Sequence, residues 1–200
     1  IAGSTPPVIG WIVASAASIP ENLNPLDLGS PVPWMLFILI FLWTPPHFWA
    51  LALYRSGEYA KVGVPMMPDV KGAKRTLLES KIYCLLLLLL GAVPLFWPDS
   101  GLPDAWAVLA TGITIWYSIS VWNIIPDEDL DANGRMPLAF ASFMRSLGYL
   151  AWMFVALVYV VAVPADHIWY WTAAFVLVVP VVNRLMLKWK ESMQTNRKVL

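Results

Sequence analysis

The chain has 200 residues, a length that fits one domain, but its composition excludes an ordinary soluble domain. Hydrophobic residues make up 59% of it and charged residues 13%, whereas typical globular domains have roughly 45–50% and about 25%. Thirteen Lys and Arg balance thirteen Asp and Glu, so the net charge does not indicate a nucleic-acid partner. A single cysteine excludes an internal disulfide. These features indicate a membrane protein.

Six charge-free segments predict membrane-spanning helices. In chain order they cover residues 1–20, 34–53, 82–98, 105–126, 146–165 and 168–183. A helix crosses the hydrocarbon core with ~20 residues, so the first five are long enough and the sixth is marginal. The segments are longer than membrane strands and do not alternate apolar with polar residues. The predicted fold class is therefore all-α, a polytopic transmembrane helix bundle that forms a single membrane domain over residues 1–200.

The basic residues predict the orientation of the spans. All thirteen Lys and Arg lie in three segments, 54–81, 127–145 and 184–200. Because basic loops stay on the cytoplasmic side, six alternating spans with these segments inside account for every cation. A soluble helical bundle, the alternative, would not sort its cations in this way. Tryptophans at the span ends favour the headgroup zone, and they are Trp34, Trp97, Trp106, Trp122 and Trp169.

The second span contains the strongest signal for a functional site. Residues 43–49 read Trp-Thr-Pro-Pro-His-Phe-Trp. The two prolines remove amide donors, so we expect the helix to break there, with Thr44 as the N-cap of a second half-helix beside a cavity. The spacing of His47, Tyr54 and Glu58 puts them on one helical face, with His47 ~16 Å below Glu58. This predicts an imidazole in a wet cavity, and the alternative is a kinked span whose His47 only bonds a neighbouring helix.

The segment after this span carries candidate ligand-binding groups. Its cations could bind a phosphate, because clustered guanidinium and ammonium donors suit that anion. They are Arg55, Lys61, Lys71, Lys74 and Arg75. Glu58 and Asp69 could hold Mg²⁺, which takes one or two carboxylates together with phosphate oxygens and water. The alternative is that the cations only follow the positive-inside rule and bind nothing.

A second acidic cluster occupies residues 127–131 on the same predicted side. Four carboxylates there could resemble a metal–diphosphate motif. Pro126, Asn133 and Gly134 are turn residues, however, so a solvated turn is the favoured interpretation.

Three stretches give the chain a resemblance to a known family. They are Gly-Ser-Thr-Pro-Pro-Val-Ile-Gly-Trp over residues 3–11, the string from Phe41 to Arg55, and Glu-Tyr-Ala-Lys-Val-Gly-Val-Pro-Met-Met-Pro over residues 58–68. On these residues the chain resembles the heme-directed farnesyltransferases, also called heme O synthases, of the UbiA-type intramembrane prenyltransferase superfamily. The resemblance is clear over residues 2–76 and weaker through residue 163.

The resemblance implies a nine-helix bundle with a cavity near the cytoplasmic face, of which about six spans are present here. It implies transfer of a farnesyl group from farnesyl diphosphate to a vinyl group of protoheme IX, which gives heme O. Mg²⁺ is the implied cofactor, and heme is a substrate. The implied partners are the two substrates and the lipid bilayer. Heme A synthase or a terminal oxidase assembly is a further implied partner, and no nucleic-acid partner is expected. The implied location is the bacterial plasma (inner) membrane, with 54–81 as a cytoplasmic substrate-binding loop and 184–200 as a cytoplasmic basic tail.

The resemblance also assigns roles to residues. Glu58 and Tyr59 match the second acidic motif as the catalytic pair, and Glu58 is the metal ligand. The implied substrate-binding residues are His47, Tyr54, Arg55, Lys71, Lys74 and Arg75, and our hypothesis is that His47 orients or ligates the heme.

The chain departs from the family pattern in four places. The first Asn/Asp-rich motif is not in this sequence, which begins at Ile1 and so suggests a missing N-terminal part. Gly57 and Glu58 stand where the family has two aspartates, Asp69 replaces an apolar residue, and 168–183 extends past the family's usual end. We therefore expect the 200-residue chain by itself to be inactive.

Two other functions stay open at this point. One is another UbiA-type prenyltransferase that uses a quinone precursor or chlorophyllide, against which the string from Thr44 to Trp49 argues. The other is a non-enzymatic heme-binding membrane protein that keeps the cavity.

Overall fold

A computed structural model describes residues 2–18, 28–61, 63–132 and 134–164, together with residues 167, 169, 172 and 173. Within these residues the chain is helical and contains no strand, which confirms the predicted all-α class. The elements are η1 (Ala2–Ser4), α1 (Pro6–Ser18), α2 (Val32–Tyr54), α3 (Ser56–Lys61), α4 (Met67–Lys71), α5 (Ala73–Phe96), η2 (Pro98–Ser100), α6 (Asp104–Trp122) and α7 (Pro137–Ala162).

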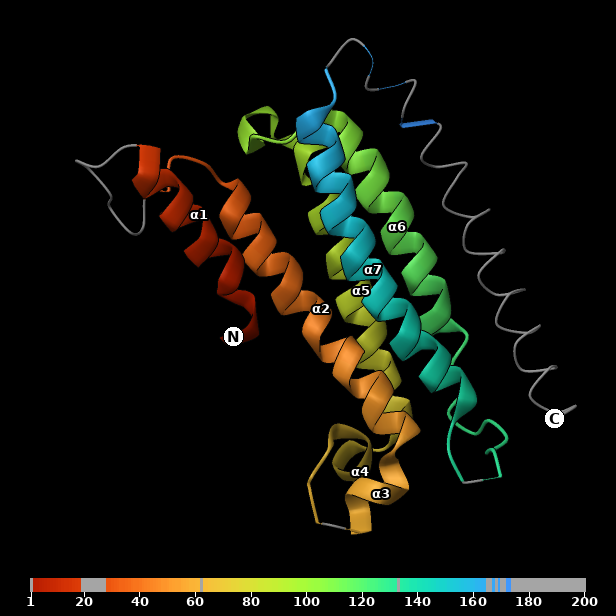
Figure 1. The fold of residues 1–200 in the computed structure, drawn as a ribbon. Coiled ribbons are helices and arrows are strands. Elements are labelled where there is room, and N and C mark those ends of the chain that lie inside the picture. Colours follow the sequence, from red (N-terminus) through yellow and green to blue (C-terminus); the bar gives the residue numbers. More distant parts are fainter. Residues whose placement is uncertain are drawn as a thin grey trace, which may run out of the picture.

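Four helices, α2, α5, α6 and α7, are long and apolar enough to cross a membrane. They contain 23, 24, 19 and 26 residues, which corresponds to ~28–39 Å against a hydrocarbon core of ~30 Å. Helices α2 and α6 each pack against both α5 and α7, so the four form a bundle, and α1 lies along α2 (Figure 1). The predicted polytopic helix bundle is therefore confirmed.

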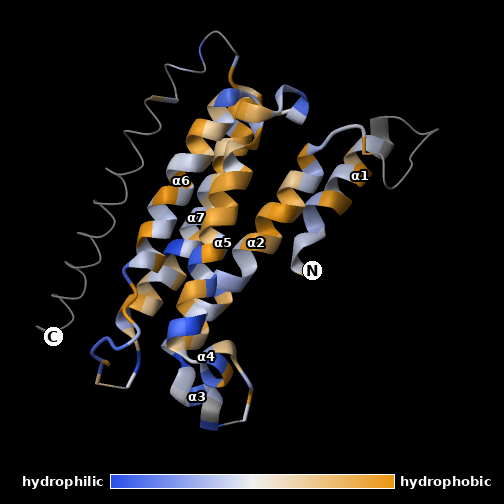
Figure 2. Cartoon of the chain, turned by 180° about the vertical axis from the view of Figure 1, so that it is seen from behind, coloured by the Kyte–Doolittle hydropathy of each residue, from blue (hydrophilic) through white to orange (hydrophobic). Residues whose placement is uncertain are grey.

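The charged segments gather at one end of this bundle. Helices α3 and α4 and the connection between α6 and α7 lie together there, and this is where hydrophilic residues concentrate (Figure 2). We call this part, the described residues within 54–72 and 123–136, the charged end. Arg55, Lys61 and Lys71 of the first predicted inside segment and Arg135 of the second belong to this end.

Some predicted boundaries differ from the structure. The segment predicted as a span over residues 1–20 forms α1, which has 13 residues and is not among the four candidate spans found in the described part. Helix α5 begins at Ala73 rather than at residue 82, and its first turns carry Lys74 and Arg75. Charge limits how much of a helix enters lipid, not where the helix begins. Most of the predicted span 168–183 and the whole tail 184–200 lie outside the described residues.

Helix α2 continues through Pro45 and Pro46, so the predicted break is wrong. Thr44 is not an N-cap either, because its hydroxyl donates to the carbonyl of Ile40 at 2.6 Å, inside the helix. Prolines are tolerated in membrane helices where neighbouring helices and Ser or Thr side chains satisfy the backbone. His47 is consequently carried by one continuous helix.

Close packing between α5 and α6 fixes one side of the bundle. A Cβ added at Gly91 would meet the Cβ of Ala110 at 3.2 Å, the kind of close approach that small residues allow between membrane helices. Trp106, predicted at the headgroup level, is 3% exposed and packs inside the bundle, so that prediction is wrong. The other four span-end tryptophans, Trp34, Trp97, Trp122 and Trp169, are exposed.

Candidate functional site

The contact between α2 and α7 holds two of the predicted site residues, His47 and Tyr54. We call it the α2–α7 seam, and it consists of Trp43, His47, Tyr54, Phe140, Phe143 and Ser146. At the charged end the ring centroids of Tyr54 and Phe140 are 4.8 Å apart, and further inside those of His47 and Phe143 are also 4.8 Å apart. Along α2, His47 lies ~10 Å deeper than Tyr54. The seam therefore connects the charged end to an interior imidazole.

His47 is buried in this seam. Its ring stacks on Trp43 at 4.3 Å and on Phe143, and its side of α2 faces α7. Its Nδ1 lies 2.5 Å from the hydroxyl oxygen of Ser146. The imidazole thus packs among aromatic rings and does not line the expected wet cavity. The structure agrees instead with the alternative interpretation, in which His47 bonds a neighbouring helix.

The hydrogen bonds around Ser146 assign the tautomer of His47. The Ser146 hydroxyl donates to the carbonyl of Phe143 at 2.5 Å, and a hydroxyl has one proton to give. Nδ1–H of His47 is then the donor to Ser146, and the lone pair of the neutral ring is on Nε2. The indole N–H of Trp43 donates to the Ser146 carbonyl at 2.9 Å, which joins the two helices at the same level.

At the charged end, Glu58 lies between two arginines. Its carboxylate accepts a hydrogen bond from Arg135 and lies 3.7 Å from the guanidinium of Arg55. Arg135 also donates to the Tyr54 hydroxyl at 3.3 Å and lies over the Tyr54 ring. The hydrogen bonds to Glu58 and Tyr54 raise the pKa of Arg135, so it stays charged. We call Tyr54, Arg55, Glu58 and Arg135 the arginine cluster.

The other predicted residues lie outside this cluster. Tyr59 is half-buried on α3, while Lys71 at the end of α4 and Lys74 at the start of α5 are exposed. Arg75 donates to Glu79 at 2.7 Å, one turn further along α5. The structure therefore brings three predicted residues together in the arginine cluster, and Arg75 pairs within its own helix.

Sequence reasoning missed Arg135 and Ser146. A signal existed for Arg135, because its segment belongs to the same predicted side as Glu58. Ser146 offered no signal, since a serine in a membrane helix commonly bonds its own backbone. Its contact with His47 depends on how α2 and α7 pack.

The predicted magnesium ligands are not part of any cluster of metal-ligating side chains in the described residues. Mg²⁺ requires nearly octahedral oxygen ligands, including one or two carboxylates. Among the described residues there is no group of three or more His, Cys, Asp or Glu side chains that could hold a metal ion. The predicted ligand Glu58 is engaged by arginines, and Asp69 is exposed in the first turn of α4.

The acidic cluster at 127–131 forms part of the turn that leads into α7. The Glu128 carboxylate accepts a hydrogen bond from the Leu138 N–H at 3.2 Å, and the Asp131 carboxylate accepts one from the Arg135 N–H at 2.9 Å. Burial raises the pKa of Glu128, partly offset by backbone hydrogen bonds. These contacts support the interpretation of the cluster as a turn.

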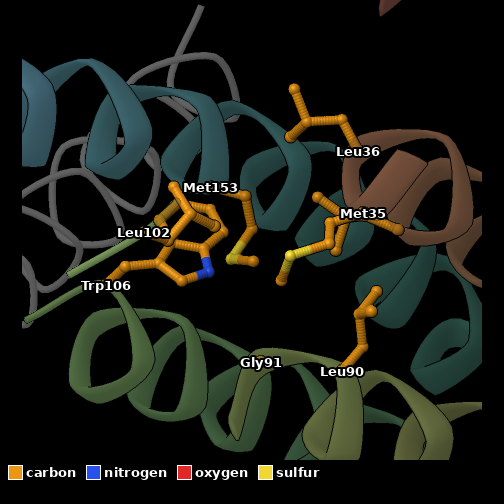
Figure 3. A pocket seen from close by; sticks show the side chains of 8 residues that line it. Met35, Leu36, Leu90, Gly91, Leu102, Trp106 and Met153 are labelled. Carbon is orange, nitrogen blue, oxygen red and sulfur yellow. The ribbon is translucent and has the colours of Figure 1, made fainter. Parts of the chain in front are cut away.

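A small hollow lies inside the bundle, away from the charged end. Met35, Met153 and Trp106 meet across it (Figure 3). It has room for about one water molecule, and its lining contains no ionisable side chain. The indole nitrogen of Trp106 is buried there without a hydrogen-bond partner in the described part of the chain. An apolar hollow of this kind can perform no acid–base or anion chemistry.

Comparison with known proteins identifies similar chains. The model of the UbiA prenyltransferase family matches residues 1–144. A protein named protoheme IX farnesyltransferase from Vesicomyosocius okutanii is 36% identical over 169 residues, which is 84% of this chain and 49% of that protein. Proteins of the same name from Parvibaculum lavamentivorans and Sinorhizobium fredii are 42% identical over 136 residues and 37% identical over 171 residues. These alignments cover 67% and 84% of this chain, and 39% and 48% of the two relatives.

The chain therefore spans about half the length of the curated relatives it matches. No solved structure matches it.

Proposed function

The chain belongs to the UbiA prenyltransferase family, and from that premise we propose that it supplies part of the active site of a protoheme IX farnesyltransferase. The enzyme transfers the farnesyl group of farnesyl diphosphate to a vinyl group of protoheme IX and gives heme O. The observation that carries the proposal is the likeness to proteins named for this activity over 136–171 residues. The proposal includes a location in the bacterial plasma membrane, which the family resemblance implies, and a cytoplasmic charged end, which the preference of basic loops for that side supports.

The reaction requires stabilisation of a leaving diphosphate. The C–O bond of the allylic diphosphate breaks, its electron pair leaves with the diphosphate, and the vinyl carbon attacks the allylic cation. Water then adds to the cation left on the former vinyl group and loses a proton, which leaves a hydroxyl group. Arg55 and Lys71 at the charged end, and Lys74 and Arg75 in the first turn of the adjoining helix α5, supply positive charge that stabilises the departing anion. Mg²⁺, the metal implied by the family resemblance, would need ligands besides Glu58.

The α2–α7 seam would serve the acceptor. Its aromatic side chains exclude water, which protects an allylic cation from premature capture. The lone pair on Nε2 makes His47 a neutral imidazole ligand of the type that heme iron takes. Tyr59 follows Glu58 on α3 and is half-buried.

The test uses membranes that contain the product of the full coding sequence, supplied with farnesyl diphosphate and protoheme IX. We expect a new heme whose mass includes a farnesyl group and a hydroxyl group, with release of diphosphate. Farnesylation of an aromatic quinone precursor in place of heme would favour another prenyltransferase. Heme binding without consumption of farnesyl diphosphate would favour a heme-binding protein. The 200-residue chain alone is expected to be inactive, and turnover by it would contradict that expectation.

A further inference from the structure

Arg135 is held in place by its own turn, independently of Glu58. Its backbone N–H donates to the Asp131 carboxylate at 2.9 Å, and its carbonyl accepts from the Asp131 N–H at 2.9 Å. Gly134 takes the left-handed conformation that closes this turn, with φ +73°. The guanidinium lies 5.3 Å from the centroid of the Tyr54 ring. If Glu58 moved away, these contacts would keep Arg135 at the mouth of the seam.

Another anion can displace Glu58 from its ion pair with Arg135. The two side chains are 44% and 33% exposed. An exposed ion pair changes the equilibrium between its paired and separated states by only about fivefold or less. The carboxylate of Glu58 offers one negative charge shared between Arg135 and Arg55. A diphosphate offers several charges and paired oxygens, which match the planar fork of arginine better. An incoming diphosphate is therefore a stronger partner for Arg135 than Glu58 is.

We propose that Arg135 is a diphosphate-binding residue of this site and that Glu58 occupies it when no anion is bound. Glu58 and the diphosphate of the allylic substrate compete for the same guanidinium, and binding of the anion releases the carboxylate. The identity of the anion rests on the proposed function. The competition itself concerns only the charged end of this chain.

The experiment measures binding of inorganic pyrophosphate to the detergent-purified product of the full coding sequence, without divalent metal. Arg135→Gln is expected to weaken binding about tenfold or more, the effect of losing hydrogen bonds to a charged group. Glu58→Gln is expected to tighten binding, by about two- to fivefold, because it removes the competitor. The matched control is Arg145→Gln, since Arg145 also lies over an aromatic ring, at 6.0 Å from that of Trp116, and is outside the arginine cluster.

A double variant separates competition from a general change of charge. Under the proposal, Glu58→Gln tightens pyrophosphate binding much less once Arg135 is glutamine, because only the weaker contact with Arg55, at 3.7 Å, is then released. If Glu58→Gln tightens binding equally in the Arg135→Gln background, the effect is general electrostatics and the proposal is wrong. Weakening by Glu58→Gln, or unchanged binding with Arg135→Gln, would also overturn it. Thermal unfolding of each variant shows that it is folded, and Arg135→Lys, which keeps the charge without the fork, is expected to bind with intermediate affinity.

The outcome is independent of the acceptor. If pyrophosphate binding follows this pattern but no heme O forms, the proposed function fails and the role of Arg135 stands. If heme O forms and Arg135→Gln binds pyrophosphate as the unaltered protein does, the role of Arg135 fails and the proposed function stands.

Discussion

Ser146→Ala tests whether α7 orients the imidazole of His47. The substitution removes the acceptor of the Nδ1–H bond, which is 2.5 Å long and buried. The Trp43 bond to the backbone carbonyl of Ser146 does not need the side chain, so α2 and α7 remain joined. We expect a loss of about 0.6 kcal/mol of stability, the average for a hydrogen bond between membrane helices. Activity should fall further, by about tenfold, as is typical when an imidazole ligand loses its orienting partner.

Ser142→Ala is the matched control for this prediction. Ser142 is also fully buried on α7, and its hydroxyl lies 3.1 Å from that of Ser120 on α6, whereas the hydroxyl that contacts His47 is that of Ser146. Thermal unfolding in detergent should show similar losses for both variants, whereas only Ser146→Ala should slow heme O formation. Ser146→Thr keeps the hydroxyl and is expected to restore most of the rate. Equal loss of activity in the two alanine variants would refute a positioning role for Ser146.

Three further predictions concern stability, measured by thermal unfolding in detergent. Gly91→Leu is expected to destabilise the protein by about 1–3 kcal/mol through overpacking, because a Cβ at this position lies 3.2 Å from the Cβ of Ala110 on α6. Gly112→Leu is the control and should be tolerated, since an added Cβ there has no neighbour within 4 Å. Tyr117→Phe should stabilise the protein by about 1 kcal/mol, since the buried Tyr117 hydroxyl has no hydrogen-bond partner among the described residues. Tyr149→Phe should destabilise the protein, because it removes the hydrogen bond between the Tyr149 and Thr114 hydroxyls. Burial raises the pKa of Glu128, so the folded state holds the carboxyl proton more tightly than the unfolded state does. The stability of the protein therefore falls as the pH rises through the raised pKa. Glu128→Gln should stabilise the protein at neutral pH and lose this advantage below pH 4.5, the ordinary pKa of the side chain.

The bundle could be predicted from the sequence because bilayer thickness and charge placement are local constraints. Each long apolar segment that the structure describes, except the first, became a helix of spanning length. The basic segments around Arg55 and Arg135 were assigned to one side by charge alone, and the structure joins them through Glu58. The face shared by His47 and Tyr54 follows from helical geometry, but Glu58, predicted on the same face, is not on it, because α2 ends at Tyr54 and Glu58 belongs to the separate helix α3.

The partners of the site residues could not be predicted in the same way. Arg135 and Glu58 are separated by 77 residues in sequence, and His47 and Ser146 by 99. Such contacts depend on how helices pack, which a single sequence does not specify. Local rules also gave a wrong result at Pro45, where a break was expected and α2 continues, because the environment of the helix outweighs the preference of one residue.

The separation between the arginine cluster and His47 bears on which acceptor the site favours. The reacting carbon of an allylic diphosphate is bonded to the diphosphate, so it stays near the cations, while His47 lies ~10 Å deeper than Tyr54 along α2. A porphyrin has vinyl groups on its rim and iron at its centre. Once α2 and α7 separate along the seam, it can therefore present a vinyl group to the charged end and its iron to the imidazole. A quinone precursor has a single small ring and leaves His47 without a role. His47→Ala should therefore lower transfer to heme, and an equal loss of transfer to an aromatic acceptor would contradict this assignment.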